Sequence, residues 1–211
     1  MTTAPEPEDL TARARIRDAA MRHFGEHGFE RATIRAIAET AGVSSGLVRH
    51  HFGSKQALRD ACDEYLSRAI SRLNDQAHDR RGVGHIAEAR IAMGPYQRYL
   101  ARTLAEGAGA SIFDDMVRMA EEWVEAADED RPDPPHVDRK SRATVATAMG
   151  LAVAILYPHV ARGLGVDLYT PEGDAKLSRT LLDIYSQPWI SPAEAATLRA
   201  GLDKFERGEP R

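Results

Sequence analysis

Apolar residues recur along this chain at intervals of three and four positions, which is the spacing of one face of an α-helix. The first such stripe is formed by Ile16, Ala19, Ala20 and Phe24, with His23 on the same face. It predicts a helix over about residues 10–26 that stops at Gly28. The following residues, to about position 76, show neither sustained two-residue alternation nor the Asn-Gly and Asp-Gly turns that indicate a β-hairpin. The pattern therefore predicts an all-α fold.

Hydroxyl side chains and glycines divide the next segment into short helices. Thr33 is a good N-cap for a second helix, and Gly42 is expected to end it in the left-handed conformation, which is costly for residues with a Cβ atom. The apolar face of this helix consists of Ile34, Ile37, Ala38 and Ala41. Ser44 then caps a third helix, Gly53 breaks it, and Ser54 caps a long fourth helix to about residue 76.

Helical patterns continue through the rest of the chain. We expect helices at about residues 86–92, 96–106, 111–127, 139–164, 171–186 and 192–207. Between them, the acidic and proline-rich residues 128–136 predict an exposed loop.

The charge of the chain is unevenly distributed. Residues 10–59 contain nine Lys or Arg and four Asp or Glu, a net charge of +5, whereas the remaining 19 basic and 28 acidic residues give −9. A basic N-terminal block on an acidic body indicates that the first quarter of the chain faces a polyanion such as nucleic acid.

The cysteine content and the apolar segments of the chain indicate its cellular compartment. The single Cys62 excludes an intrachain disulfide, and the N-terminus lacks the pattern of a signal peptide. The apolar run at residues 143–160 reaches the lower length limit of a membrane span, but it is rich in alanine and contains Pro158. We therefore predict a buried helix there, no membrane contact and a cytoplasmic protein.

The stretch AETAGVSSGLVRHHFGSK, residues 38–55, carries the most specific signal. Two short helices joined by AGVS, with a third helix behind them, match the helix-turn-helix geometry, in which the second helix lies in the major groove of DNA. Val48 and Phe52, four residues apart, anchor that helix from beneath. This leaves Ser45, Gly46, Leu47, Arg49 and His50 facing outward.

Residues 33–58, TIRAIAETAGVSSGLVRHHFGSKQAL, resemble the DNA-binding signature of the TetR/AcrR family of bacterial transcriptional regulators. The resemblance covers about 50 residues and includes the preceding FGEHGFERATI. It implies a helix-turn-helix domain at residues 10–56, followed by a helical ligand-binding and dimerisation domain at residues 57–208. The residues it places at DNA are Thr33, Arg35, Ser44, Ser45, Gly46, Leu47, Arg49, His50, His51 and Lys55.

Physical chemistry supports these assignments. Helix N-termini offer free N–H groups to phosphates, and a lysine is a point charge for the same group. Positions 49 and 51, often aromatic in the family, are Arg49 and His51 here. Arg49 either reads a guanine by a bidentate contact or binds a phosphate, and the sequence leaves both open.

Residues 57–208 are expected to supply a partner interface and a ligand pocket. Small residues at four-residue spacing allow a helix to approach closely, and by resemblance to the family the helices at 139–164 and 171–186 pair with their copies in a homodimer. The alternative is that both fill the core of one monomer. The interface residues in this prediction are Ala146, Gly150, Ala154, Leu177, Leu181, Ile184 and Tyr185.

A pocket for a small apolar or aromatic effector is predicted from methionines and aromatic residues, although each of these is also an ordinary core residue. The predicted wall consists of Met93, Tyr96, Tyr99, Phe113, Met116, Met119, Trp123, Met149 and Tyr157.

A competing interpretation is metal chemistry. The segment HFGEH, residues 23–27, fits the H-x-x-E-H pattern of one class of zinc peptidases. Gly25 interrupts this helix, however, and no later segment offers an obvious third ligand. We therefore expect no metal, no cofactor and no enzyme.

The sequence predicts a ligand-released repressor that binds a palindromic operator as a homodimer. The alternative is a DNA-binding regulator without an effector.

Overall fold

The computed structural model describes residues 7–80, 96–129, 131, 133–187 and 189–208, and all regular secondary structure in these ranges is helical. The N-terminal helices are α1 (Pro7–His27), α2 (Ile34–Ala41), α3 (Ser45–Phe52) and the long α4 (Lys55–Arg80). An unlabelled helix at residues 96–105 follows. The remaining helices are α6 (Ala110–Glu129), α7 (Arg139–Ile155), α8 (Tyr157–Leu164), α9 (Pro171–Ser186) and α10 (Pro192–Glu206).

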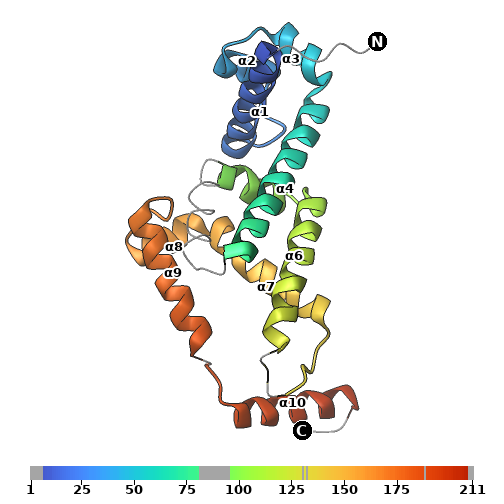
Figure 1. Cartoon of the computed structure of the whole chain (residues 1–211), viewed down its shortest axis with the longest axis vertical. Coiled ribbons are helices and arrows are strands. Elements are labelled where there is room, and N and C mark those ends of the chain that lie inside the picture. The colour runs from blue at the N-terminus through green and yellow to red at the C-terminus, as the bar shows by residue number, and fades with distance from the viewer. Residues whose placement is uncertain (1–6, 81–95, 130, 132, 188, 209–211) are drawn as a thin grey trace.

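The helices form two regions joined by α4 (Figure 1). We call α1, α2, α3 and the first turns of α4 the head. The helices from residue 96 onward, with the rest of α4, are the body. α4 runs from the head down beside α6, so it belongs to both regions (Figure 1).

Local signals set the boundaries of the short helices in the head. The Thr33 hydroxyl accepts a hydrogen bond from the backbone N–H of Ala36 at 3.1 Å, which caps α2. Gly42 ends α2 with a φ of 67°, in the left-handed region where glycine is favoured. The Ser44 hydroxyl accepts from the N–H of Leu47 at 3.1 Å and caps α3. These predictions from the sequence are confirmed.

The head has a well-buried apolar core, which continues into the body at residues such as Tyr99 and Ile112. Ile16 of α1, Ile37 of α2 and Val48 of α3 are fully buried, and they meet Leu58 and Cys62 of α4. Burial in apolar surroundings raises the pKa of the Cys62 thiol far above its usual range, so this side chain acts as a small apolar group. The short helices are thus held by packing as much as by their caps.

The head meets the body where α1 crosses the helix of residues 96–105. A Cβ atom on Gly25 would lie 2.8 Å from the backbone nitrogen of Tyr99, so only glycine allows this approach. The Arg102 guanidinium donates to the carbonyl of Gly25 at 2.9 Å, and the Tyr99 hydroxyl donates to Asp63 of α4. Backbone contact and hydrogen bonds together fix this joint.

The prediction of one continuous helix at residues 139–164 is wrong. α7 ends at Ile155, and α8 starts at Tyr157 after a bend of 74°. Pro158 explains the break, because it has no N–H to donate and its ring clashes with the carbonyl four residues earlier.

In the described ranges no single helix has both the length and the hydropathy of a membrane span. Only α7 and α8 taken together, across their bend, meet these two criteria. The helix expected at residues 86–92 lies outside the described residues.

Candidate nucleic-acid interface and ligand cavity

The outer face of α3 is polar and basic. Arg49, His50 and Gly46 are exposed, whereas Ser45 and Leu47 are half-buried. Val48 and Phe52 lie on the opposite face in the head core. The helix therefore presents one cation and one imidazole from a fixed backbone.

Further polar groups lie at the N-termini of α2 and α3 and along α2. Thr33 and Ser44, the N-caps of α2 and α3, are both exposed, so the N-terminal turns of these helices are open to an anion. The Arg35 guanidinium donates to the Glu39 carboxylate at 2.9 Å along the exposed face of α2. An arriving phosphate therefore has to compete with Glu39 for Arg35.

Lys55 is engaged with the backbone of the head. Its ammonium group donates to three backbone carbonyls, those of Phe29 at 2.7 Å, Ala32 at 3.1 Å and Glu30 at 3.2 Å. An ammonium group has three N–H donors, so these bonds occupy all of them. Lys55 holds the loop between α1 and α2, and the predicted phosphate contact stays a prediction that requires the ammonium group to exchange one of these bonds.

His51 is less accessible than Arg49 and His50 on the same helix. Its ring is half-buried between the rings of His50 and Phe52, and its Nε2 atom is buried without a hydrogen-bond partner among the described residues. Arg13 of α1, which the sequence analysis did not single out, donates to the backbone carbonyl of His51 at 3.2 Å and lies over the Phe52 ring. The exposed Arg13 thus adds a cation beside the end of α3.

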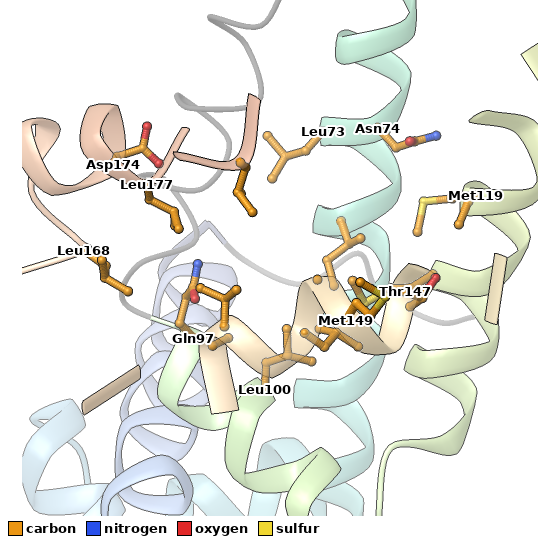
Figure 2. A pocket seen from close by; sticks show the side chains of 18 of the residues that line it. Leu73, Asn74, Gln97, Leu100, Met119, Thr147, Met149, Leu168, Asp174 and Leu177 are labelled. Carbon is orange, nitrogen blue, oxygen red and sulfur yellow. The ribbon is translucent and has the colours of Figure 1, made fainter. Parts of the chain in front are cut away.

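The body contains a cavity of about 480 Å³ (Figure 2). Five residues of the predicted pocket line it: Met116, Met119, Trp123, Met149 and Tyr157. Residues that the prediction missed complete much of the wall, and they include Leu73, Asn74, Gln97, Leu100, Thr147, Leu168 and Asp174. Figure 2 shows labelled side chains such as Leu73, Met149 and Leu177 lining one space from segments far apart in the sequence.

Three residues of the predicted pocket are not part of this wall. Tyr99 is buried against Phe24 of α1, Tyr96 packs edge-on against Tyr65 of α4, and Phe113 packs against the main core cluster. Met93 lies outside the described residues. The three aromatic side chains belong to the core between α4 and the body.

Five residues of the predicted dimer interface also line the cavity: Gly150, Ala154, Leu177, Leu181 and Tyr185. Ala146 and Ile184 are exposed and lie outside the wall. Met149 and Tyr185 line the cavity and are nevertheless 57% and 67% exposed. The same parts of α7 and α9 therefore form both a cavity wall and an outward apolar face.

The cavity wall is mainly apolar but contains several polar side chains, including those of Asn74, Gln97, Thr147 and Asp174. The Thr147 hydroxyl belongs to a side chain that is only 8% exposed, and it has no hydrogen-bond partner in the described part of the chain. Trp123 donates its indole N–H to Asn74 at 2.9 Å. Tyr169 stacks on Tyr157, and burial raises its pKa to about 12, so this phenol is neutral at physiological pH. The space suits an apolar molecule that carries a hydrogen-bonding group.

The HFGEH segment is engaged in other contacts. The Nε2 atom of His23 lies 2.7 Å from the Thr40 hydroxyl, and burial lowers the pKa of His23 below its usual value of 6.5. In the described ranges no group of three His, Cys, Asp or Glu side chains could hold a metal ion. The contact with Thr40 ties His23 to α2.

Comparison with known proteins agrees with this geometry. The model of the bacterial regulatory proteins, tetR family, matches residues 16–62. The HTH-type transcriptional regulatory protein RaaS of Mycobacterium tuberculosis is 33% identical over 209 residues, which cover 95% of this chain and 96% of that protein. The HTH-type transcriptional repressor AcnR of Corynebacterium efficiens is 41% identical over 58 residues, or 28% of this chain and 31% of AcnR.

Solved structures share the fold over most of the chain. The fatty acid degradation regulator FadR from Bacillus halodurans superposes with a TM-score of 0.60 at 17% identity, covering 83% of this chain and 97% of that chain. A gamma-butyrolactone receptor, an ArpA-like protein, gives 0.57 at 22% identity and covers 71% of this chain and 81% of that one. Likenesses at this identity establish the all-α fold.

Proposed function

Because this chain belongs to the TetR family of DNA-binding transcriptional regulators, we propose that it is a repressor that binds an inverted-repeat operator as a homodimer and is released by a small effector. The observation that carries the proposal is the exposed basic face of α3 on a helix clamped by Val48 and Phe52. A rigid helix of this kind can enter the major groove without rearrangement. Its place of action is the cytoplasm, where bacterial DNA lies.

In this proposal the head contacts DNA in two ways. The N-terminal turns of α2 and α3, at Thr33 and Ser44, bind phosphates through backbone N–H groups, and Arg35 adds a charge. The outward residues of α3, with Arg49 as the long cation, meet base edges. Arg13 contributes a backbone contact beside α3.

Two heads on a palindromic site require a partner subunit. The exposed apolar side chains of α7 and α9 support pairing of these helices with their copies, because large exposed apolar patches are uncommon on monomers. The cavity opens on the same face, at Met149 and Tyr185. Dimerisation and ligand binding would therefore influence each other.

The cavity supports an effector that is mostly apolar and carries one group able to hydrogen bond. Methionine and aromatic side chains adapt to such molecules, and the unpartnered hydroxyl of Thr147 gives the polar group a place. Anionic effectors fit less well, because the described lining residues include no Lys or Arg and a charge is costly to bury without a partner.

Two helices link the cavity to the head. Gln97 and Leu100 line the cavity, and on the same helix Tyr99 and Arg102 form the joint with α1 and α4. α4 also reaches from the cavity wall at Leu73 into the head. An effector that displaces either helix changes the separation of the two heads, and the operator must then weaken effector binding by the same factor.

Selection of bound DNA from a random pool, at a stated salt concentration, tests the proposal. We expect an inverted repeat whose half-sites are separated by about one helical turn or a multiple of it. A single half-site or no sequence preference would contradict dimeric reading.

The Arg49→Ala variant then separates base reading from phosphate binding. Relaxed preference at one base pair per half-site indicates a base contact, whereas a uniform loss of affinity indicates a phosphate contact. Arg118→Ala, an exposed arginine of α6 in the body, is the matched control and should bind DNA as the wild type does. The alternative function, a regulator without an effector, would stand if no apolar compound that fills the cavity altered DNA affinity.

A further inference from the structure

The C-terminal helix is apolar on one side, and that side is exposed among the residues that the structure describes. We call residues 189–206 the C-terminal arm. Its large apolar side chains are mostly exposed, with Trp189 at 84% and Phe205 at 74%. None of the residues of α10, all of which the structure describes, is buried. The helix lies at the end of the molecule farthest from the head (Figure 1).

α10 is nevertheless strongly specified as a helix. The Ser191 hydroxyl accepts from the N–H of Glu194 at 3.2 Å, while the Glu194 carboxylate accepts from the N–H of Ser191 at 2.8 Å, which completes a capping box. Pro192 occupies the first turn, where its lack of an N–H costs nothing. A helix of this length is marginal in water even with such capping signals. Packing of its apolar face on another surface would supply the rest of its stability.

The apolar residues of the arm share one face. Leu198, Leu202 and Phe205 are spaced four and three residues apart, which places them in one stripe. Ala196, Arg199 and Asp203 lie on other faces of the helix. Trp189 and Ile190 add exposed apolar surface just before the helix.

A second copy of this chain is the occupant that fits best. The arm follows α9 after a few residues, and the outward side chains Leu182, Ile184 and Tyr185 of α9 are themselves exposed. A copy seated on α7 and α9 would therefore lie within reach of the arm, because five residues of extended chain span about 17 Å. The arm's apolar surface would extend the proposed dimer interface.

The exposed area also favours this occupant. Burying two aromatic side chains removes about 300 Å² or more from water, and a stable interface needs about 800 Å² per partner. Two-fold symmetry supplies the contribution of the arm twice, once from each copy.

We propose that the C-terminal arm packs its apolar stripe on the body of the second copy, so that each arm completes the fold of its partner. This inference rests on the proposed homodimer. It assigns the exposed stripe of α10 to one interface and makes the arm a main determinant of dimer affinity.

Trp189 provides a direct probe, because the chain contains only two tryptophans. The fluorescence of the full-length chain minus that of the Trp189→Phe variant isolates its emission. Sedimentation velocity defines the concentrations at which the chain is monomeric and dimeric. We expect blue-shifted emission and weak acrylamide quenching in the dimer, and exposed emission after dilution to monomer. Exposed emission in the dimer, or equal burial in the monomer, would overturn the proposal, the latter because the arm would then cover its own chain.

A pair of full-length variants tests the affinity. Leu198→Asp/Leu202→Asp places charges in the stripe, and Ala196→Asp places the same charge elsewhere on α10. We expect the dimer dissociation constant to rise by about tenfold or more in the double variant and to change by less than about twofold in the control. If the wild type is a dimer and the double variant has the same dimer dissociation constant, the arm proposal is overturned and the proposed homodimer stands. A wild type that is monomeric at every concentration overturns both.

Discussion

The head and the body of this chain use similar apolar residues but bury them to very different extents. Ile37 and Val48 of the head are fully buried, whereas Met149 and Tyr185 of the body are more than half exposed. Within one chain the head has a well-buried core, and the body has an open cavity and an uncovered face. The comparison fits the proposed function, in which the head is complete in one chain and the body awaits a ligand and a second copy.

The physical origin of this difference lies in helix contacts. In the head, α2 and α3 are short and lie against α1 and α4, so almost every apolar side chain finds a neighbour. In the body, the break at Leu156 turns α8 and α9 away from the axis of α7. The cavity lies between residues of α7 and α9.

The largest expected effect comes from truncating matched apolar residues in the two regions. Ile37→Ala should lower the free energy of unfolding by about 3 kcal/mol at every protein concentration, because it leaves a cavity in a well-buried core. Leu202→Ala should change it by less than about 0.5 kcal/mol in the monomer and by more in the dimer. Urea unfolding at two concentrations checks this, and equal losses for both variants in the monomer would break the comparison.

The joint between the regions should tolerate no added atom. Gly25→Ala places a Cβ atom 2.8 Å from the backbone nitrogen of Tyr99, and relief of this contact should lower stability by about 1–3 kcal/mol. Gly163→Ala in α8 meets no atom within 4 Å and should instead stabilise the protein by up to about 1 kcal/mol through helix propensity. Thermal unfolding compares the two variants. A stable Gly25→Ala protein would mean that head and body are more loosely joined than the structure indicates.

The cavity should gain stability when its unpartnered hydroxyl is removed. Thr147→Val keeps the shape of the side chain and should raise the free energy of unfolding of the ligand-free protein by about 1 kcal/mol. Thr144→Val is the control on the same helix, because the Thr144 hydroxyl already donates to the Lys140 carbonyl at 2.7 Å. It should give no gain. Destabilisation of Thr147→Val relative to this control would argue against an unsatisfied group in the cavity.

A smaller effect is expected from pH in the head. Burial, with the nearby His27, lowers the pKa of His23 in the folded protein below its value of 6.5, which we take for the unfolded chain. The unfolded state therefore binds a proton more readily, and stability should fall as pH drops from about 7.5 to about 5.5. His23→Gln should flatten this dependence, as measured by urea midpoints at both pH values. An unchanged slope in the variant would assign the pH dependence to other groups.

The sequence was most informative where structure depends on local chemistry. Thr33, Gly42 and Ser44 act on neighbouring backbone atoms, so the boundaries of α2 and α3 follow from the residues themselves. The outward position of Arg49 follows from the same helical register. The fold class and the family could be predicted on this basis.

Contacts between distant segments were harder to predict. Lys55 meets carbonyls of a loop more than twenty residues earlier, and Tyr99 turns toward Asp63 instead of the cavity. Periodicity shows that a side chain is buried but not against which helix it packs. For the same reason the sequence predicted two separate sets of residues, one for the ligand pocket and one for the dimer interface. In the structure members of both sets line one cavity. Pro158 is a visible signal in the sequence for the break before α8, which the apolar periodicity alone does not show.

Amide hydrogen exchange at protein concentrations above and below the dimer dissociation constant tests the central claim most directly. The account predicts that α1, α2 and α3 keep the same protection at both concentrations, because their core is buried within one chain. It also predicts that α7, α9 and α10 lose protection on dilution. Equal protection of these body helices in monomer and dimer, or loss of protection in the head together with them, would contradict the account.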